Sequence, residues 1–139
     1  MSMFDDYPRV ADAARVGTYP ALTFSGGGYV WDAVLEYRVW YPTHRGEVFR
    51  AFATYGDALE YSGRTPGAEA PLALVRQDEF IDEPEPGSFA HVKNMRVTEW
   101  PVEFLRRPRR TATTIPDFFS PDAPANRLDI LQGAAKSRA

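Results

Sequence analysis

Residues 33–41 read AVLEYRVWY, and their side chains alternate in character along the chain. One parity is apolar or aromatic and consists of Ala33, Leu35, Tyr37, Val39 and Tyr41. The other parity holds Glu36 and Arg38 between two apolar residues. This period of two, rich in aromatic and β-branched side chains, predicts a half-buried strand with Glu36 and Arg38 side by side on its second face.

A hairpin and a short helix are expected after this strand. The sequence PTHRG at 42–46 is typical of a turn, and a second strand-like run follows at 47–53, so we predict an antiparallel pair. Thr54 stands three residues before Asp57, as in the capping box that begins a helix. We expect this helix to last about two turns and to end at Gly63.

The following segment, up to Leu105, is expected to add strands. Residues 72–81 predict a third strand, and EPEPG at 83–87 predicts a loop, because two prolines and a glycine leave little regular structure. Short strands at 89–92 and 95–98 flank Lys93-Asn94, which has the character of a tight hairpin turn.

These elements predict an α+β fold. We expect a single domain with four or five mostly antiparallel strands, one or two short helices and an irregular Pro-rich C-terminal tail. In this scheme residues 1–20 form an N-terminal arm, 21–105 the α+β core, 106–133 a wrapped tail and 134–139 a frayed end. Within the tail we expect one helix at about 125–132, ended by Gly133.

The composition is that of a soluble globular protein, with 139 residues, of which 44% are hydrophobic and 25% charged. The absence of cysteine excludes disulfides, thiolate metal sites and a cysteine nucleophile. The sequence has neither an apolar run long enough for a membrane helix nor the pattern of a signal peptide. We therefore expect a cytoplasmic protein that does not bind membranes.

Charge is distributed unevenly along the chain, whose net charge is −3. Residues 1–105 carry nine basic and sixteen acidic side chains, whereas 106–139 carry seven basic and three acidic ones. We expect the tail to dock onto the body, with the Arg106–Arg110 cluster partly neutralising the acidic run Asp78–Glu85. Because the basic residues form no wider field, we expect no nucleic-acid binding.

Two features form the candidate ligand site. Gly26, Gly27 and Gly28 form either a ligand loop or a turn or β-bulge, since three glycines allow close approach of another group. Arg38 lies between Tyr37 and Trp40, and an arginine among aromatic rings suits recognition of a carboxylate or phosphate. The alternative for Arg38 is an ion pair with its strand neighbour Glu36.

No set of catalytic or metal-ligating residues stands out. Arg38 and Glu79 are weak catalytic candidates, and a structure is needed to decide whether they share a cavity with the glycine loop. His44 and His91 are 47 positions apart, and neither their spacing nor the serine contexts indicate a metal site or a catalytic triad. We expect no metal.

Several stretches resemble a family of small uncharacterised bacterial proteins, sometimes labelled GCN5-related acetyltransferases. They include LEYRVW at 35–40, AFATY at 51–55, TPGAE at 65–69, TEWPVEFL at 98–105 and NRLDIL at 126–131. The label implies acyl transfer from acetyl-CoA, whose pyrophosphate that family binds with an R/Q-x-x-G-x-G/A turn opening a helix. The nearest segment here, Arg64–Glu69, has glutamate where the motif has glycine or alanine.

A second resemblance is to ADP-ribosyltransferases, which use NAD. Arg38, Thr54 and the run Gln77-Asp78-Glu79 occur in the order in which that family places an arginine, a hydroxyl motif and a Gln/Glu-x-Glu. From the residues themselves we expect a domain that binds a small anionic ligand or a protein partner, with no cofactor. Acetyl-CoA and NAD enter only under the two enzymatic alternatives, and a homo-oligomer is compatible with every reading.

Overall fold

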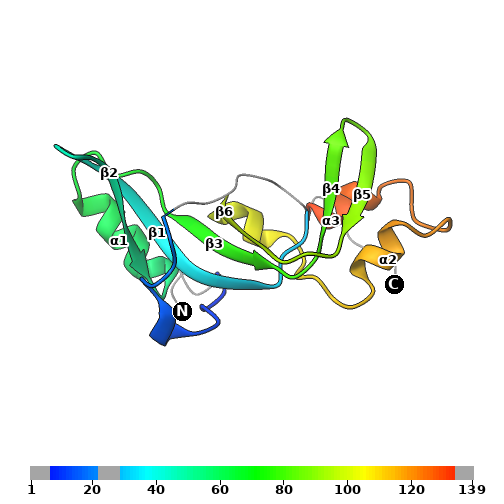
Figure 1. Ribbon diagram of the computed structural model, residues 1–139, viewed down its shortest axis with the longest axis horizontal. Helices are drawn as coiled ribbons and strands as arrows, with labels where there is room; N and C mark the ends of the chain where they lie inside the picture. Colours follow the sequence, from blue (N-terminus) through cyan, green and yellow to red (C-terminus); the bar gives the residue numbers. More distant parts are fainter. Residues whose placement is uncertain (1–6, 22–28, 134–139) are drawn as a thin grey trace.

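Strand β1 (Ala33–Thr43) is the centre of the fold, as the alternation at 33–41 predicts. The computed structural model describes residues 7–21 and 29–133. The C-terminal half of β1 pairs antiparallel with β2 (Gly46–Phe52), and its N-terminal half pairs antiparallel with β3 (Leu72–Gln77). Strand β6 (Arg96–Pro101) pairs with β3, which gives a four-stranded sheet in the order β2-β1-β3-β6 (Figure 1).

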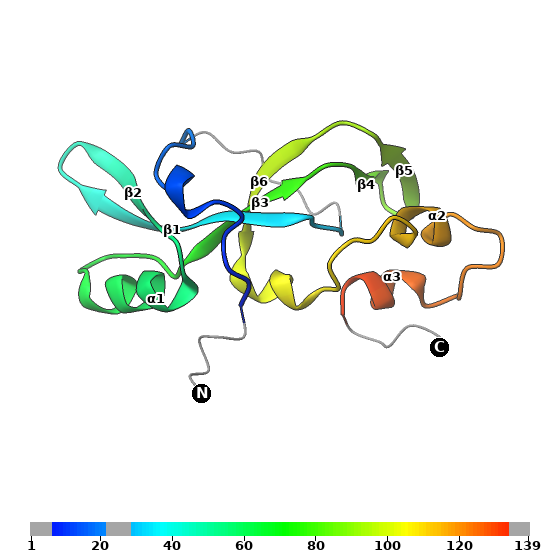
Figure 2. The same ribbon diagram turned by 90° about the horizontal axis from the view of Figure 1, so that it is seen from below.

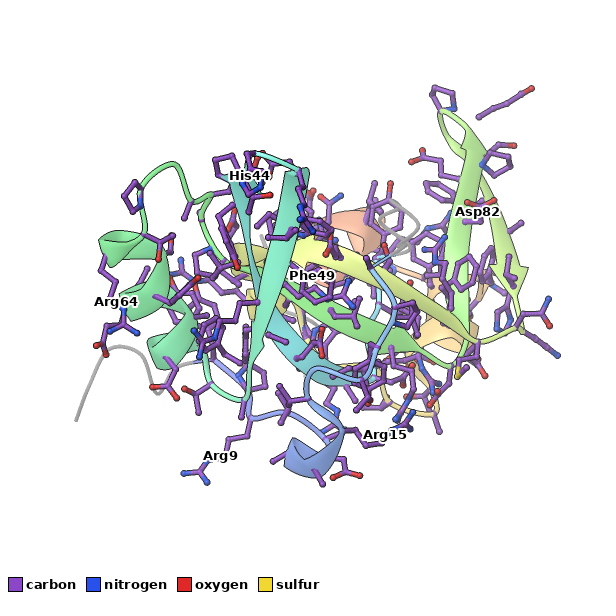
Figure 3. The ribbon with its side chains drawn as sticks, turned by 60° about the vertical axis from the view of Figure 1, so that its left-hand side comes forward. Arg9, Arg15, His44, Phe49, Arg64 and Asp82 are labelled. Atoms are coloured by element: carbon purple, nitrogen blue, oxygen red, sulfur yellow. The ribbon has the colours of Figure 1, made fainter. Side chains whose placement is uncertain are left out.

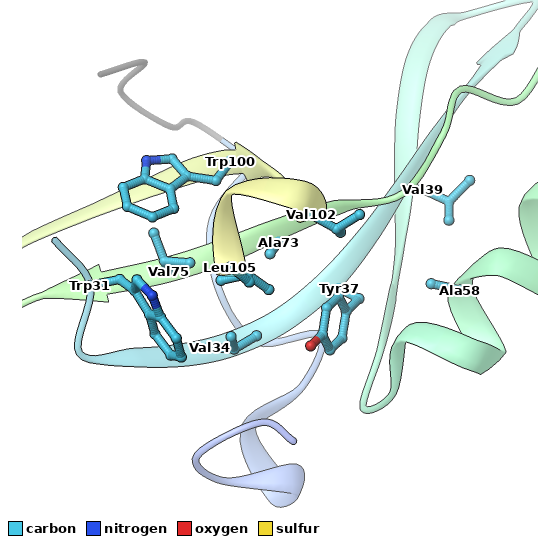
Figure 4. Packing of buried hydrophobic residues seen from close by; sticks show 10 residues of the cluster. All are labelled: Trp31, Val34, Tyr37, Val39, Ala58, Ala73, Val75, Trp100, Val102 and Leu105. Carbon is cyan, nitrogen blue, oxygen red and sulfur yellow. The ribbon is translucent and has the colours of Figure 1, made fainter. Parts of the chain in front are cut away.

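One face of this sheet carries the main hydrophobic core. Helix α1 (Tyr55–Arg64) and the 3₁₀ helix η3 (Val102–Arg106) pack on this face. The core consists of Trp31, Val34, Tyr37, Val39, Ala58, Ala73, Val75, Trp100, Val102 and Leu105 (Figure 4). Full burial of each large apolar side chain contributes about 1.5–3 kcal/mol, so this face provides much of the stability of the fold.

A two-stranded sheet forms the opposite end of the molecule from α1 and β2. Strands β4 (Phe80–Glu85) and β5 (Ser88–Val92) make an antiparallel hairpin. Helices α2 (Thr114–Phe118) and α3 (Arg127–Leu131) of the tail lie beside it (Figure 2). The buried side chains of this second core are Val30, Phe80, Ile81, Ile115, Phe118 and Leu131.

The predicted α+β fold class is confirmed. The described residues hold six strands, one more than the upper number expected, and the strands pair antiparallel. The hairpin at 33–53 forms, and Thr54 Oγ1 accepts a hydrogen bond of 3.1 Å from the Asp57 N–H at the start of α1. Gly133, at φ +75°, follows α3 as predicted, whereas Gly63 lies inside α1.

The prediction of one strand over 72–81 is wrong, and the predicted loop at 83–87 is confirmed only at the turn of Pro86 and Gly87, because β4 continues to Glu85. The strand breaks after Gln77, where the Asp78 N–H donates to the Asp32 carboxylate at 2.7 Å instead of to a neighbouring strand. Strand β4 then runs through Pro84, which a two-stranded hairpin tolerates because its register shifts between Asp82 and Glu85.

The predicted hairpin around Lys93-Asn94 is also wrong. Strand β5 pairs with β4, and β6 pairs with β3, so residues 93–95 connect the two sheets. Local turn chemistry indicated a hairpin, but the longer-range pairing of β6 with the central sheet buries Trp100 against the main core.

The tail docks onto the body, as its charge predicts. Arg110 forms a salt bridge of 2.8 Å with the buried Asp32 and lies 3.8 Å from Glu79 in the acidic run. The hydrogen bond to Asp32 raises the pKa of Arg110. None of the helices in the described part of the chain combines the length and the apolar character that a bilayer span requires.

Candidate functional site

The second face of the central sheet is covered by the N-terminal arm. Residues 7–10 run beside the N-terminal half of β1, where Val10 forms a parallel bridge with Val34. The arm then crosses to the side of the sheet opposite α1, through the short 3₁₀ helix η2 (Ala13–Arg15), as Figure 2 shows. There the Gly17 N–H donates to Glu36 Oε1 at 2.9 Å. The arm therefore lies over the charged pair of β1.

Arg38 is completely buried beneath the arm, with an exposed fraction of 0%. Its Nε donates to Glu36 Oε2 at 2.6 Å, and its Nη1 donates to Glu99 Oε2 at 3.1 Å. Its Nη2 donates to the Pro20 carbonyl at 2.6 Å, and its guanidinium carbon lies 4.2 Å from the centre of the Phe49 ring. In Figure 3, Phe49 lies on β2 over the sheet. All three nitrogens are thus used inside the protein.

These contacts change the interpretation of the predicted Arg38 site. A ligand cannot reach Arg38 or Glu36 while the arm is in place, because neither side chain is exposed. Tyr37 faces the main core, where it is buried and its hydroxyl donates to the Pro8 carbonyl. Burial raises the pKa of Tyr37, so it stays a neutral phenol. Arg38 and Tyr37 hold the arm and the sheet together.

The other predicted site residues are not brought together with Arg38. Gly26, Gly27 and Gly28 lie outside the described residues. Glu79 follows the far end of β3, whereas Arg38 pairs with Leu72 at its beginning. At about 3.3 Å per residue the intervening strand spans about 17 Å. Arg38 and Glu79 therefore do not share a cavity.

Glu79 and Trp40 lie in different surroundings. Glu79 Oε1 is 2.9 Å from His91 Nε2, on the hairpin side of the molecule. His44 lies at the turn between β1 and β2, at the other end of the molecule (Figure 3). Trp40 Nε1 donates to Glu99 at 2.8 Å. Trp40 lines a small hollow of about 370 Å³ whose other lining residues are Glu47, Glu69, Leu72 and Glu99.

A larger pocket lies between the arm, the central sheet and the β4–β5 hairpin. Its volume is about 470 Å³, within the range of small-molecule sites. The wall is mainly apolar and is formed by Tyr19, Pro20, Leu74, Phe80, Val92, Asn94, Met95, Arg96 and Val97. We call it the Arg96 pocket. Met95 at this pocket is 66% exposed, an unusually high value for a large apolar side chain.

Arg96 is the one cation among the residues found to line this pocket. Its Nε donates to Gln77 Oε1 at 2.8 Å, and its guanidinium carbon lies 3.7 Å from the centre of the Phe80 ring. Its Nη2 atom is buried and has no hydrogen-bond partner within the described ranges 7–21 and 29–133. Over those same ranges, no carboxylate forms a salt bridge with Arg96.

Burial and a nearby carboxylate act in opposite directions on the charge of Arg96. Burial lowers the pKa of Arg96, because desolvation disfavours its charged form, and the negative charge of Asp82 acts in the opposite direction. A cation that is taken out of water without a paired counter-ion is costly. An anionic group placed in the pocket would compensate that cost.

Arg107 offers a useful comparison within the same molecule. Its Nη1 is also buried without a partner in the described part of the chain, and burial lowers the pKa of this arginine too. Its guanidinium carbon lies 4.0 Å from the Phe104 ring centre and 5.3 Å from that of Trp100. Arg107 does not line either hollow, as far as the described residues show. Of these two arginines, Arg96 is therefore the one that lines a pocket.

Sequence reasoning missed Arg96. It stands in the run Met95-Arg96-Val97, where an isolated cation in a strand looks like any solvent-exposed residue. Phe80, sixteen positions earlier, packs under the guanidinium of Arg96. The sequence does not indicate this contact, because it depends on how the two sheets meet. An exposed Met95 beside it is a local hint, but it does not identify a pocket.

The segments behind the two family resemblances occupy structural positions. The segment Arg64–Glu69 begins at the last residue of α1 and leads toward β3, so it does not open a helix. Thr54 caps α1, and Gln77 Nε2 donates to the Val30 carbonyl at 2.8 Å. Comparison with known proteins gave no match to this chain among protein-family models, curated proteins or solved structures.

Proposed function

We propose that this chain is a binding domain for a small anionic ligand with an apolar body, held in the Arg96 pocket. The proposal keeps the class of ligand expected from the sequence and moves its site from Arg38 to Arg96. The observation that carries it is a partly buried arginine that forms no salt bridge within the described residues and lies beside a mainly apolar hollow of about 470 Å³.

The pocket combines an apolar wall with one charged side chain, and this combination supports the proposed function. Leu74, Phe80 and Val97 offer apolar surface, whose removal from water contributes about 25 cal/mol per Å². Arg96 offers its charge and its Nη1 group, which makes no hydrogen bond within the described residues, and charge-assisted hydrogen bonds are stronger than neutral ones. Few polar groups in an apolar hollow are the usual composition of a small-molecule site.

The arm is a further part of the proposed site. Pro20 lines the pocket, and its carbonyl accepts the hydrogen bond from Arg38. Arg38 and Glu36 thereby act as positioning residues, since they hold the arm from beneath and do not touch the ligand.

The test uses anilinonaphthalene sulfonate, an apolar monoanion that becomes fluorescent in apolar sites. We expect saturable binding to the native protein, mapped by amide shifts at Leu74 and Val97. Arg96→Met keeps an apolar side chain over Phe80 but removes the charge, and should weaken binding about tenfold or more. Arg76→Met is the matched control, because it removes the same charge from the neighbouring strand outside the pocket lining.

Two results contradict the proposal. Equal binding by the native protein and Arg96→Met shows that the arginine does not recognise the anion. Equal weakening by Arg96→Met and Arg76→Met shows that the probe responds only to the overall charge of the surface. Circular dichroism of each variant, matched to the native spectrum, excludes loss of the fold as the cause.

A further inference from the structure

The charges near the Arg96 pocket restrict the head group of its ligand. Among the residues found to line the pocket, Arg96 is the charged one and Asn94 is a neutral polar neighbour. Asp82 stands two residues after Phe80 on β4, so it shares the strand face whose ring stacks on the guanidinium. Asp82 therefore contributes a negative charge on the same side as Arg96.

This arrangement discriminates between anions of different charge. A single negative charge on the ligand can pair directly with the guanidinium, with which Asp82 forms no salt bridge. A second negative charge has no cation left to balance it and is repelled by Asp82, in an environment where the apolar wall weakens screening. An unpaired charge beside an apolar wall raises the free energy of the complex, so a dianion is disfavoured relative to a monoanion.

The geometry of the donor and the shape of the wall restrict the ligand further. The flat guanidinium already uses Nε for Gln77 and its Nη2 is buried, which leaves Nη1 to meet a carboxylate oxygen of the ligand. The rest of the wall comes mostly from aliphatic and aromatic side chains of the arm, β3, the hairpin and β6. We infer that the ligand is an apolar monocarboxylate, an inference that rests on the proposed binding function.

The same considerations separate this ligand from the nucleotide cofactors of the two enzymatic alternatives. Acetyl-CoA and NAD carry several phosphate charges, for which the lining of the Arg96 pocket offers one cation. An aliphatic or aromatic acid needs only that one charge.

The experiment compares four probes with the same eight-carbon chain by calorimetry: octanoate, octyl phosphate, octanol and octylammonium. At about pH 8 octyl phosphate is mostly a dianion, because the second pKa of a phosphate ester is about 6. We expect octanoate to bind about tenfold or more tightly than octyl phosphate and octanol, and octylammonium not to bind. Hexanoate should bind about fifteenfold more weakly than octanoate, about fourfold for each methylene removed.

The outcomes distinguish the inference from the proposed function. If octyl phosphate binds as tightly as octanoate or more tightly, the monocarboxylate inference is wrong but binding of an apolar anion stands. If octanol matches octanoate, or if neither anion binds, the proposed function itself is wrong. Arg96→Met should remove the difference between octanoate and octanol, whereas Arg76→Met should keep it. Persistence of the difference in Arg96→Met would place the head group elsewhere and overturn the inference.

Discussion

Arg38 on β1 and Arg96 on β6 are two arginines of one sheet with opposite surroundings. Arg38 is fully buried, donates hydrogen bonds to two carboxylates and a backbone carbonyl, and packs against an aromatic ring. Arg96 has an aromatic face and one amide oxygen, and its Nη2 has no partner in the described chain. The hydrogen-bonding nitrogens of Arg38 all have partners within the fold, whereas those of Arg96 have partners only in part.

The difference lies in how fully the fold itself binds each guanidinium. A buried ion pair with every donor bonded ties its elements together, and here it ties the arm to the sheet. A partly buried charge beside an apolar hollow, without a counter-ion, is a feature that a stable fold does not need. The comparison is therefore why we propose Arg96, and not Arg38, as the arginine that binds the ligand.

The largest expected effect is at Arg38. Arg38→Met leaves Glu36 fully buried without its cation, and removing one partner of a buried pair costs about 3–5 kcal/mol. We expect this loss in the free energy of unfolding, measured by urea denaturation. Amide exchange at Gly17 should also become faster, because the arm loses its anchor.

A second variant keeps this prediction testable if Arg38→Met does not fold. Arg38→Lys retains the charge but not the three-nitrogen geometry, so it should be destabilised by less than Arg38→Met. A loss below about 1 kcal/mol in Arg38→Met, the range of an exposed ion pair, would contradict the structural role.

A smaller and different effect is expected at Arg96 in the absence of ligand. Arg96→Met loses the hydrogen bond to Gln77, but it also removes a desolvated charge and keeps apolar contact with Phe80. Because these changes oppose each other, we expect the free energy of unfolding to change by no more than about 1 kcal/mol in either direction. Urea denaturation beside Arg38→Met measures the contrast directly. A loss as large as that of Arg38→Met would make Arg96 a structural residue as well.

The two arginines also show what the sequence can predict. The alternation of 33–41 identified the central strand and placed Glu36 beside Arg38, and the turn-like run 42–46 identified the hairpin, because these features depend on neighbours in the chain. Full burial of that pair was not predictable, since it depends on the arm at residues 17–20 crossing the sheet. Arg96 was missed for the same reason.

The errors in strand pairing have the same origin. Turn chemistry at Lys93-Asn94 is a local signal, and it indicated a hairpin that would have joined 89–92 to 95–98. The chain instead pairs β6 with β3 and so places Trp100 in the main core. The pairing of β6 with β3 creates the junction of the two sheets at which Phe80 lies under Arg96. The pocket was therefore missed because this strand pairing was missed.

The smallest expected effect is at Glu83, a carboxylate on the hairpin that is not buried as Arg38 is. The Tyr29 hydroxyl donates to its Oε1 at 2.5 Å and the Gly87 N–H to its Oε2 at 2.8 Å. These bonds, the one from Tyr29 first, lower the pKa of Glu83. Its folded pKa therefore lies below its unfolded value of about 4.3.

The sign of the pH dependence follows from that order. Glu83 stabilises the fold above its unfolded pKa, and this contribution is lost as the pH falls through the lower folded pKa. Carboxyl-carbon NMR titration should show Glu83 titrating below the ordinary glutamate range, and in Tyr29→Phe its midpoint should rise toward that range. The same midpoint in both proteins would mean that the hydroxyl does not hold the carboxylate. In that case the Tyr29 hydroxyl would contribute nothing to stability through Glu83, in contrast to the buried pair of Arg38 and Glu36.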